Sequence, residues 1–418
     1  EVGTTTFRPP YVPVEFGAIG GSRPGPHVLP SRRTPMTDWH EAAGAVMYEA
    51  GGRWRRPGYY PRPGEGMEEA TERESLAVRQ GVGIYDGTPL GKFELAGPDV
   101  VRLLNLIFAN AWDTLAERRG RYGVMLAEDG LMIDDGVVFR LDGGRYMLIS
   151  ATGNAEATHA RLERILQVDC PGLQVLITPV TTQWANATVC GPRARDVLKR
   201  AGTDVDISPG AFAFMAMAEG RLADLPVRIF RVSYTGELSF EINTPARHGL
   251  ALWEKLMEAG AEYGITPVGS EANHVLRVEK GFLSFGHEID GTVDPIDLGM
   301  SWAVSRKKAD FIGKRAMQIR RRGETRRREL VGLLSDDPEV VIAEGAPLTR
   351  LGRKEDAEGF VTASVRSVSQ ARSVALALLE DGRARLGETV YARVADRIIP
   401  ARVSEPIFHD PDGTRLRS

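Results

Sequence analysis

The order of apolar and polar positions along the chain predicts strands and helices in alternation. The clearest helix covers Met67–Gln80. The acids Glu68, Glu69 and Glu72 crowd its first turns, where they suit the positive end of the helix dipole. Similar patterns predict further helices over Trp39–Met47, Asn154–Gln167 and Leu250–Tyr263.

Two segments repeat one order of strand, break and helix. The first copy has a strand at Lys92–Ala96, a break at Gly97-Pro98 and a helix at Asp99–Leu106. The second copy has a strand at Ala187–Cys190, a break at Gly191-Pro192 and a helix at Arg193–Ala201. Proline suits the start of each helix, because the N–H that it lacks would have no partner there. We interpret the pair as a duplicated strand–helix unit.

Short turn signals between apolar runs predict antiparallel hairpins. Asp129-Gly130 separates Val124–Ala127 from Leu131–Arg140, and Asp142–Gly144 leads on to a strand at Tyr146–Ser150. In the second half, Thr235-Gly236 separates Val227–Tyr234 from Leu238–Asn243. Antiparallel strands followed by helices are typical of the α+β class.

After about Glu324 the pattern changes to short strands with turns between them, which predicts a small β-barrel or sandwich. The strands are Leu330–Leu334, Gly359–Arg366, Ser373–Leu379, Thr389–Arg393 and Ile398–Ser404. We therefore expect three parts: an extended, Pro- and Gly-rich arm over residues 1–33, a body over 34–323 and a barrel over 324–418. The arginine runs at 320–322 and 326–328 are interpreted as a solvated linker in preference to an anion site.

The composition favours an ordinary globular protein. Of 418 residues, 42% are hydrophobic and 26% are charged, and a formal net charge of −3 gives no support to nucleic-acid binding. No apolar run approaches the ~20 residues that a membrane helix needs. The two cysteines, Cys170 and Cys190, lie among apolar neighbours and are expected to be buried and inert. A reducing, cytoplasmic compartment fits this usage.

Two adjacent acids interrupt an apolar strand. Asp134 and Asp135 follow Ile133, although aspartate is disfavoured in strands. If the strand stays regular, the two side chains face opposite ways, and one carboxylate lies among apolar side chains, which is costly unless it is paired or functional. The alternative is a turn or bulge at Asp134–Gly136 with both acids solvated.

A third acid, Glu241, lies between Phe240 and Ile242 in another apolar strand. A carboxylate in such a place can accept two hydrogen bonds from the N–H and NH2 edge of a pterin or a guanidinium. Tyr234, before the turn, is expected on the same side. From this pattern alone, the favoured interpretation of Glu241 is a salt bridge or a charge on an edge strand.

The sequence contains no motif for the other common kinds of site. The seven histidines are scattered without the spacing of a helical zinc pair, so no metal is predicted. The chain contains no Gly-rich dinucleotide or Walker loop, no flavin fingerprint, no GxSxG elbow and no nucleophile context for a cysteine.

Several segments in order resemble the aminomethyltransferase (T-protein) family of the glycine cleavage system. They are Thr34-Pro35-Met36, Asp38-Trp39-His40, Gly83–Asp86, Gly91–Phe93, Gly97-Pro98, Glu128–Asp135, Tyr234–Glu241, Arg277–Gly281, Gly286–Asp290 and Phe311–Lys314. Within the family the chain is most similar to the C-terminal, folate-binding half of the large (alpha) subunits of heterotetrameric sarcosine oxidases. That likeness rests on Thr4–Tyr11, Ala211–Met215 and His274–Phe282.

The resemblance implies roles for five residues. Asp135 matches the family's catalytic aspartate, and Tyr122 matches an active-site tyrosine. Tyr234 and Glu241 match folate contacts, with the glutamate on the pterin's amino edge, and Phe282 matches a second aromatic residue near the pterin. Two positions depart from the family. Asn273 stands where the T-protein has the arginine that holds the folate tail, and Ala151 stands where it has an asparagine.

The implied function is one-carbon transfer with tetrahydrofolate. A partner flavoprotein subunit of the beta type would oxidise sarcosine or a similar N-methyl amine to an iminium, which this chain would convert to 5,10-methylenetetrahydrofolate. Small subunits would complete a heterotetrameric complex, and flavin and NAD would lie on partner chains or on an N-terminal half that precedes Glu1. The alternatives are a stand-alone folate-dependent demethylase or aminomethyltransferase, and a non-catalytic folate-binding or structural subunit.

Overall fold

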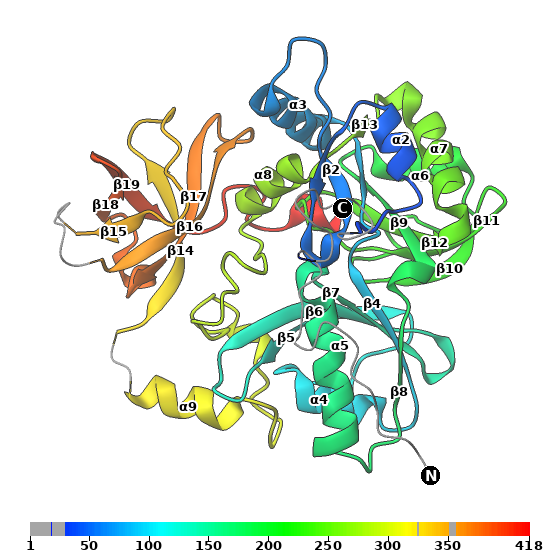
Figure 1. Ribbon diagram of the computed structural model, residues 1–418, viewed down its shortest axis with the longest axis horizontal. Helices are drawn as coiled ribbons and strands as arrows, with labels where there is room; N and C mark the ends of the chain where they lie inside the picture. The colour runs from blue at the N-terminus through cyan, green and yellow to red at the C-terminus, as the bar shows by residue number, and fades with distance from the viewer. Residues whose placement is uncertain (1–17, 19–29, 324–325, 351–356) are drawn as a thin grey trace.

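The computed structural model describes residue 18 and residues 30–323, 326–350 and 357–418. The predicted arm over residues 1–33 falls almost wholly outside the described residues, and so does the predicted boundary at Glu324. Two sheets with their helices form the body, and a barrel lies beside them (Figure 1). The α+β class is therefore confirmed.

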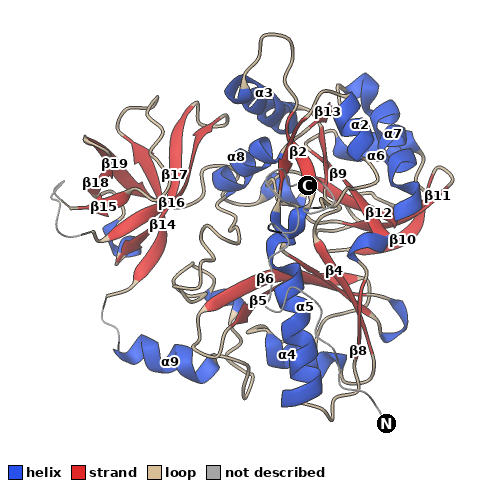
Figure 2. Ribbon diagram, viewed as in Figure 1, coloured by secondary structure: helices blue, strands red, loops and turns tan. Residues whose placement is uncertain are grey.

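The first sheet of the body has five strands in the order β5-β6-β7-β4-β8. The strands are β4 Gly91–Ala96, β5 Arg119–Leu126, β6 Met132–Arg140, β7 Tyr146–Ser150 and β8 Leu176–Pro179. Helices α4 (Val100–Ile107) and α5 (Ala155–Arg164) cover one face of this sheet (Figure 2). Leu103, Leu104 and Ile107 of α4 point toward the sheet and form part of the hydrophobic core between helix and sheet.

The second sheet has six strands in the order β10-β11-β12-β9-β3-β13. The strands are β3 Gly83–Asp86, β9 Trp184–Cys190, β10 Met217–Leu222, β11 Leu225–Phe230, β12 Ser239–Pro245 and β13 Thr266–Pro267. Helices α6 (Ala194–Ala201) and α7 (Gly249–Gly260) pack on this sheet around a core that includes Trp253 and Phe240.

Three further helices and a short hairpin belong to the body, besides helix α9 (Lys314–Gly323) near its end. Helix α2 covers Thr37–Ala42, α3 covers Met67–Gln80 and α8 covers Ser270–Lys280. Strands β1 (Val46–Glu49) and β2 (Arg55–Tyr59) form a two-stranded sheet. Helix α8 lies between the six-stranded sheet and the barrel (Figure 1). It therefore stands at the junction of the parts.

The duplicated unit is present as predicted, with one copy in each sheet. Strand β4 leads to α4 through Gly97, and β9 leads to α6 through Gly191. Both glycines have a positive φ, 132° and 120°. A Cβ at Gly97 would lie 2.2 Å from the backbone oxygen of Gln174, and one at Gly191 would lie 2.5 Å from that of Gly81. Only glycine fits these two turns without displacing backbone.

The C-terminal strands close into a barrel in the order β14-β17-β16-β15-β18-β19. They are β14 Arg328–Ser335, β15 Pro347–Thr349, β16 Gly359–Ser367, β17 Arg372–Glu380, β18 Thr389–Val394 and β19 Arg397–Ser404. Five of these were predicted, and the three-residue β15 was not. Beyond the barrel the chain returns to the body, where the short helix α10 (Thr414–Arg417) lies at the centre of Figure 1.

Three local predictions are wrong. The helix predicted over Trp39–Met47 ends at Ala42, because Gly44 turns the chain with a φ of 80° and Met47 enters β1. The hairpin predicted over Thr235-Gly236 is wider, since β11 ends at Phe230 and β12 begins at Ser239. Cys170 is partly exposed, whereas Cys190 is buried and burial raises the pKa of its thiol to about 12.

The arginine run is not a solvated linker throughout. Arg321, in helix α9 (Lys314–Gly323), donates to the buried Asp294 and Asp297 at 2.9 Å each. Arg327 donates from Nε to Asp297 at 2.8 Å and also binds Asp294. Buried carboxylates need such partners, and the ion pairs of Arg327 connect the segments on either side of the predicted boundary.

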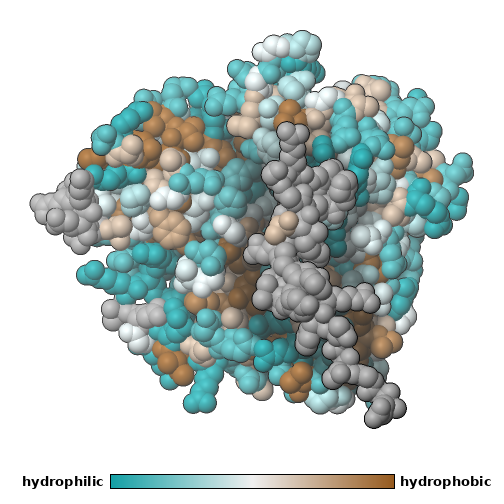
Figure 3. All heavy atoms as spheres, viewed as in Figure 1, coloured by the Kyte–Doolittle hydropathy of each residue, from teal (hydrophilic) through white to brown (hydrophobic). Residues whose placement is uncertain are grey.

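No helix in the described ranges is long and apolar enough to cross a membrane. The face shown in Figure 3 is largely hydrophilic, with hydrophobic groups gathered over the barrel at the upper left. Large apolar side chains such as Ile398 and Leu386 are exposed on the barrel.

Candidate active site

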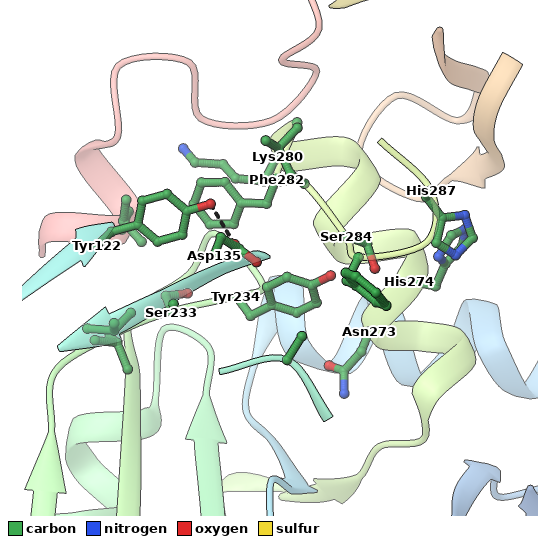
Figure 4. Close-up of a pocket in the computed structure, with 18 of the residues that line it drawn as sticks. Tyr122, Asp135, Ser233, Tyr234, Asn273, His274, Lys280, Phe282, Ser284 and His287 are labelled. Atoms are coloured by element: carbon green, nitrogen blue, oxygen red, sulfur yellow. Dashed lines mark hydrogen bonds between the residues drawn. The ribbon is translucent and has the colours of Figure 1, made fainter. Parts of the chain in front are cut away.

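A cavity of about 1120 Å³ reaches from the two sheets of the body to the barrel and the C-terminal segment. Its wall contains all five residues that the sequence singled out, which are Tyr122, Asp135, Tyr234, Glu241 and Phe282. They come from strands β5, β6 and β12, from the β11–β12 connection and from the loop after α8. Residues far apart in the sequence therefore meet in one place (Figure 4).

Asp135 and Tyr122 form the shortest polar contact in this group. The register of the β5–β6 pair shifts between Met125 and Leu126, just before the two acids. From there the pairing is regular, with Asp135 opposite Val124 and Tyr122 opposite Val137. The tyrosine and the aspartate are thus diagonal neighbours on one face of the sheet. The hydroxyl of Tyr122 donates to Asp135 Oδ2 at 2.5 Å, as the dashed line in Figure 4 marks.

Asp134 faces the other side, so the alternative of a turn with both acids solvated is wrong. Its side chain is buried, and its two oxygens accept hydrogen bonds from Thr158 Oγ1 at 2.6 Å and from the Asp135 backbone N–H at 2.9 Å. Burial, together with the charge of Asp135, raises the pKa of Asp134 to about 7. The hydrogen bonds of Asp134 thus join strand β6 to helix α5, whereas Asp135 faces the cavity.

Burial also raises the pKa of Asp135, to about 6, against the opposing effect of the Tyr122 hydroxyl. The pKa of Tyr122 is raised well above its usual value, first by burial and then by the adjacent carboxylate. Near pH 7 the pair therefore consists mainly of a neutral phenol that donates to a carboxylate. A negative charge in a mostly apolar cavity attracts a cation and can accept a proton.

Glu241 is a buried carboxylate that opens onto the same cavity. It stands on β12 between Phe230 of β11 and Thr188 of β9. Burial raises its pKa to about 7, and the positive charge of Lys92 opposes this. Within the described part of the chain, no group donates a hydrogen bond to this carboxylate, so the predicted salt-bridge alternative is limited to a long-range attraction by Lys92.

Lys92 is a residue whose importance the sequence did not reveal. Its side chain is 1% exposed, and Nζ donates to the backbone oxygens of Thr88 and Leu90 at 2.9 and 3.0 Å. Burial lowers its pKa to about 8, while Glu241 and Asp86 act in the other direction. Leu90 lines the cavity, so the lysine both supports this wall and places a positive charge behind Glu241.

The two remaining predicted aromatic residues flank the acids. Tyr234 belongs to the β11–β12 connection and not to a strand, and its hydroxyl lies against Ser284 (Figure 4). Phe282 follows α8, where Gly281 ends the helix with a φ of 70° and the Phe282 N–H binds the Arg277 oxygen at 2.9 Å. The Phe282 side chain lines the same cavity as Tyr122 and Asp135, as Figure 4 shows.

The two positions that depart from the family also line the cavity. Asn273 lies in the first half of α8, and its Oδ1 is buried without a hydrogen-bond donor. Ala151 follows β7. The cavity wall further holds His274 and His287, whose ring centroids are 5.2 Å apart. Both histidines face Glu344 of the barrel, His274 Nε2 at 3.3 Å and His287 Nδ1 at 3.7 Å.

Over the ranges that the structure covers, no group of three or more His, Cys, Asp or Glu side chains could hold a metal ion. The sequence prediction of no metal site stays a prediction.

Two families of domains match the chain. Residues 36–308 match the GCVT N-terminal domain, and residues 328–410 match the glycine cleavage T-protein C-terminal barrel domain. Among solved structures, the glycine cleavage system aminomethyltransferase T from Bartonella henselae superposes with a TM-score of 0.79. It is 28% identical, and the match covers 92% of this chain and 99% of that one.

Curated relatives fall into two groups. Sarcosine oxidase subunit alpha from Corynebacterium sp. (strain P-1) is 43% identical over 421 residues, which cover 99% of this chain and 43% of that protein. The subunit from Rhizobium meliloti is 41% identical over 424 residues, which cover the whole of this chain and again 43% of the relative. The chain therefore spans less than half the length of these subunits and matches their C-terminal part.

The second group consists of aminomethyltransferases that the chain matches over nearly their whole length. That of Symbiobacterium thermophilum is 32% identical over 385 residues, which cover 91% of this chain and 98% of that protein. Together with the two matched domains and the shared fold, this similarity shows that the chain belongs to the GCVT family of glycine cleavage T-proteins.

Proposed function

We propose that this chain binds tetrahydrofolate in the cavity and transfers to it the methylene carbon of an iminium. The products are 5,10-methylenetetrahydrofolate and the free amine, which leaves with the two protons lost from the folate nitrogens. The iminium would come from sarcosine or a similar N-methyl amine, oxidised at a flavin outside this chain. Flavin and NAD would lie on partner subunits or on a preceding half of a longer protein. The observation that carries the proposal is the meeting of Asp135, held by Tyr122, with the donor-free carboxylate of Glu241 in one cavity.

The residues present fit a reduced pterin. A pterin carries N–H and NH2 donors along one edge, and a buried carboxylate that lacks donors needs such a partner. Glu241 meets this description. A cavity of about 1120 Å³ is large enough for a folate-sized ligand, and Phe282 and Tyr234 supply aromatic walls. When bound, tetrahydrofolate would supply the nucleophilic nitrogen that accepts the one-carbon unit.

Each protein group then has a task. Lys92 favours the ionised form of Glu241, which accepts two hydrogen bonds more strongly than the neutral acid does. Tyr122 favours the ionised form of Asp135 and fixes its orientation. The Asp135 carboxylate stabilises the cationic iminium or accepts a proton from the attacking nitrogen. Both tasks require the carboxylate to be charged and near the reacting carbon. Apolar walls limit hydrolysis to formaldehyde.

A second candidate is a stand-alone folate-dependent aminomethyltransferase or demethylase. It is favoured by one observation, namely that the chain covers 98% of the Symbiobacterium thermophilum aminomethyltransferase. Asn273 at the position of the T-protein tail arginine weighs against a true T-protein. Purification of the native protein with or without a flavoprotein partner separates the two candidates.

The test compares tetrahydrofolate binding with the fate of the one-carbon unit. In the complex with its flavoprotein partner, the wild-type chain should convert N-methylglycine and tetrahydrofolate into 5,10-methylenetetrahydrofolate. Asp135→Asn should release formaldehyde instead and keep most of the affinity for tetrahydrofolate. Glu241→Gln should weaken the affinity.

Two outcomes would contradict the proposal. If the wild-type chain does not bind tetrahydrofolate, no folate enzyme is present. If it binds but Asp135→Asn transfers the carbon at the wild-type rate, Asp135 does not have the role assigned to it. Binding without any transfer in the complex would leave a non-catalytic folate-binding subunit.

A further inference from the structure

Among the cations on the cavity wall, Arg56 differs from the rest. Lys280 binds Asp410 at 3.0 Å, Arg383 binds Glu329 at 3.4 Å, and Arg417 donates to the Asp412 oxygen at 3.2 Å. The side chain of Arg56 has no hydrogen bond and no ion pair with any residue in the part of the chain that the structure describes, and its Nε is buried without an acceptor. A partly buried guanidinium without a partner is costly, so it indicates that a partner is supplied from beyond the described residues.

The backbone around Arg56 is held firmly. Arg56 lies in β2, and Glu74 of α3 accepts the N–H of Tyr60 at 2.7 Å and that of Gly269 at 2.8 Å. A Cβ at Gly269 would lie 2.0 Å from the Gly58 oxygen, which shows how closely β2 meets the start of α8. The guanidinium is therefore presented from a rigid junction and not from a mobile loop.

The electrostatic surroundings of Arg56 suit an anion. Burial lowers the pKa of Arg56, and Tyr234 and Glu271 offset this only at long range. The first turn of α8, with Gly269 and Ser270 on the cavity wall, adds the positive end of a helix dipole on the same side. A planar guanidinium can bind a carboxylate with two parallel hydrogen bonds.

We propose that Arg56 binds the carboxylate-bearing tail of the ligand whose other end is bound by Glu241. The proposal rests on the proposed function, in which that ligand is tetrahydrofolate with its glutamyl tail. Arg56 then recognises the acidic end of the ligand, and Glu241 recognises its donor-rich end. Asn273 has only neutral groups to offer a carboxylate, so the cation nearby in the fold takes this task.

The test uses two ligands that differ in the tail. Tetrahydrofolate carries the glutamyl carboxylates, and 6-methyltetrahydropterin has the same reduced ring without a tail. Binding of each is measured calorimetrically with the wild-type chain, with Arg56→Met and with Arg56→Lys. Arg55→Met is the matched control, because Arg55 is the preceding residue of β2, pairs with Glu41 at 2.9 Å and does not line the cavity.

Arg56→Met should weaken tetrahydrofolate binding by ~10- to 100-fold, the range expected for loss of a charged hydrogen-bonded pair. Its affinity for 6-methyltetrahydropterin should stay within about twofold of wild type, which also shows that the variant is folded. Arg56→Lys should keep part of the preference, since a point charge replaces the bidentate fork. Arg55→Met should bind both ligands as the wild type does.

Each other outcome overturns the inference. Equal weakening for both ligands would give Arg56 a structural or ring-binding role, and no weakening for either would remove it from the site. A carboxylate on the amine is a second source of the same chemistry. If Arg56→Met loses N-methylglycine binding but keeps that of tetrahydrofolate, the arginine serves the amine. Failure of the wild type to bind both reduced pterins would instead contradict the proposed function.

Discussion

Replacing Tyr122 by phenylalanine tests the electrostatic description of the site. The change removes the hydroxyl that donates to Asp135 Oδ2 at 2.5 Å and keeps the aromatic ring. A hydrogen bond to a charged group contributes about 1.5–3 kcal/mol, and one pKa unit equals about 1.4 kcal/mol. The pKa of Asp135, about 6 in the wild type, should therefore rise by about 1–2 units.

The sign follows from which form the phenol favours. Tyr122 donates to the carboxylate and so stabilises the charged form, and its loss moves ionisation to higher pH. In the pH dependence of kcat/KM for methylene transfer, the acid limb should move from near pH 6 to about pH 7–8. Activity well above that range should recover much of the wild-type value, because the carboxylate is then ionised again.

The matched control is Tyr146→Phe, which removes a buried hydroxyl in strand β7 of the same sheet. No hydrogen bond between that hydroxyl and Asp135 occurs within the described structure, so the acid limb of this variant should stay where it is in the wild type. An unmoved limb in Tyr122→Phe, or a shift to lower pH, would refute the assignment of Asp135 as the group whose ionisation controls transfer.

Three further predictions concern stability. The pKa of Asp134, about 7, lies above its ordinary value near 4, so the neutral carboxyl stabilises the folded state. This contribution to the free energy of unfolding is complete below about pH 4 and is lost as the pH rises through 7. Between pH 5 and 7.5, the free energy of unfolding in denaturant should fall by about 2–3 kcal/mol more for the wild type than for Asp134→Asn. An equal fall in both proteins would contradict this. Gly97→Ala should lower the free energy of unfolding by roughly 1–3 kcal/mol in the same measurement. Gly172 has open space around it, so Gly172→Ala should have little effect. Equal effects of the two changes would argue against the tight turn at Gly97. Arg327→Met leaves Asp297 short of a partner and should cost about 3 kcal/mol in thermal unfolding, whereas Arg326→Met, at a side chain 79% exposed, should cost little; the reverse order would contradict the network.

Much of the fold could be predicted because its signals are local. Helix α3 has the predicted bounds, Met67–Gln80, since its acidic first turns and its glycine at each end are visible in the sequence. The β5–β6 hairpin follows from Asp129-Gly130, and the duplicated unit follows from two Gly-Pro breaks. Strand β15 was missed because three residues leave no period. The helix over Trp39–Met47 was predicted too long, since nothing local indicated that Met47 would pair with Pro57 in a hairpin.

The site shows the same division. Asp135 stood out because an acid in an apolar strand violates a local preference, and the structure indeed orients it toward the cavity. Lys92 and Arg56 left no such signal. Their importance depends on Glu241 and on the start of α8, which are distant in sequence and close only in the folded chain. The pairing of Arg321 and Arg327 with Asp294 and Asp297 was missed for the same reason.

We propose that the cavity is a tetrahydrofolate site in which Glu241 binds the pterin edge. Calorimetric titration of tetrahydrofolate into the wild-type chain and into Glu241→Gln tests it most directly. The wild type should bind one equivalent saturably, and the affinity of the variant should be lower by ~10-fold or more, because an amide can accept at only one of the two oxygen positions. Equal affinities, or no binding by the wild type, would contradict it.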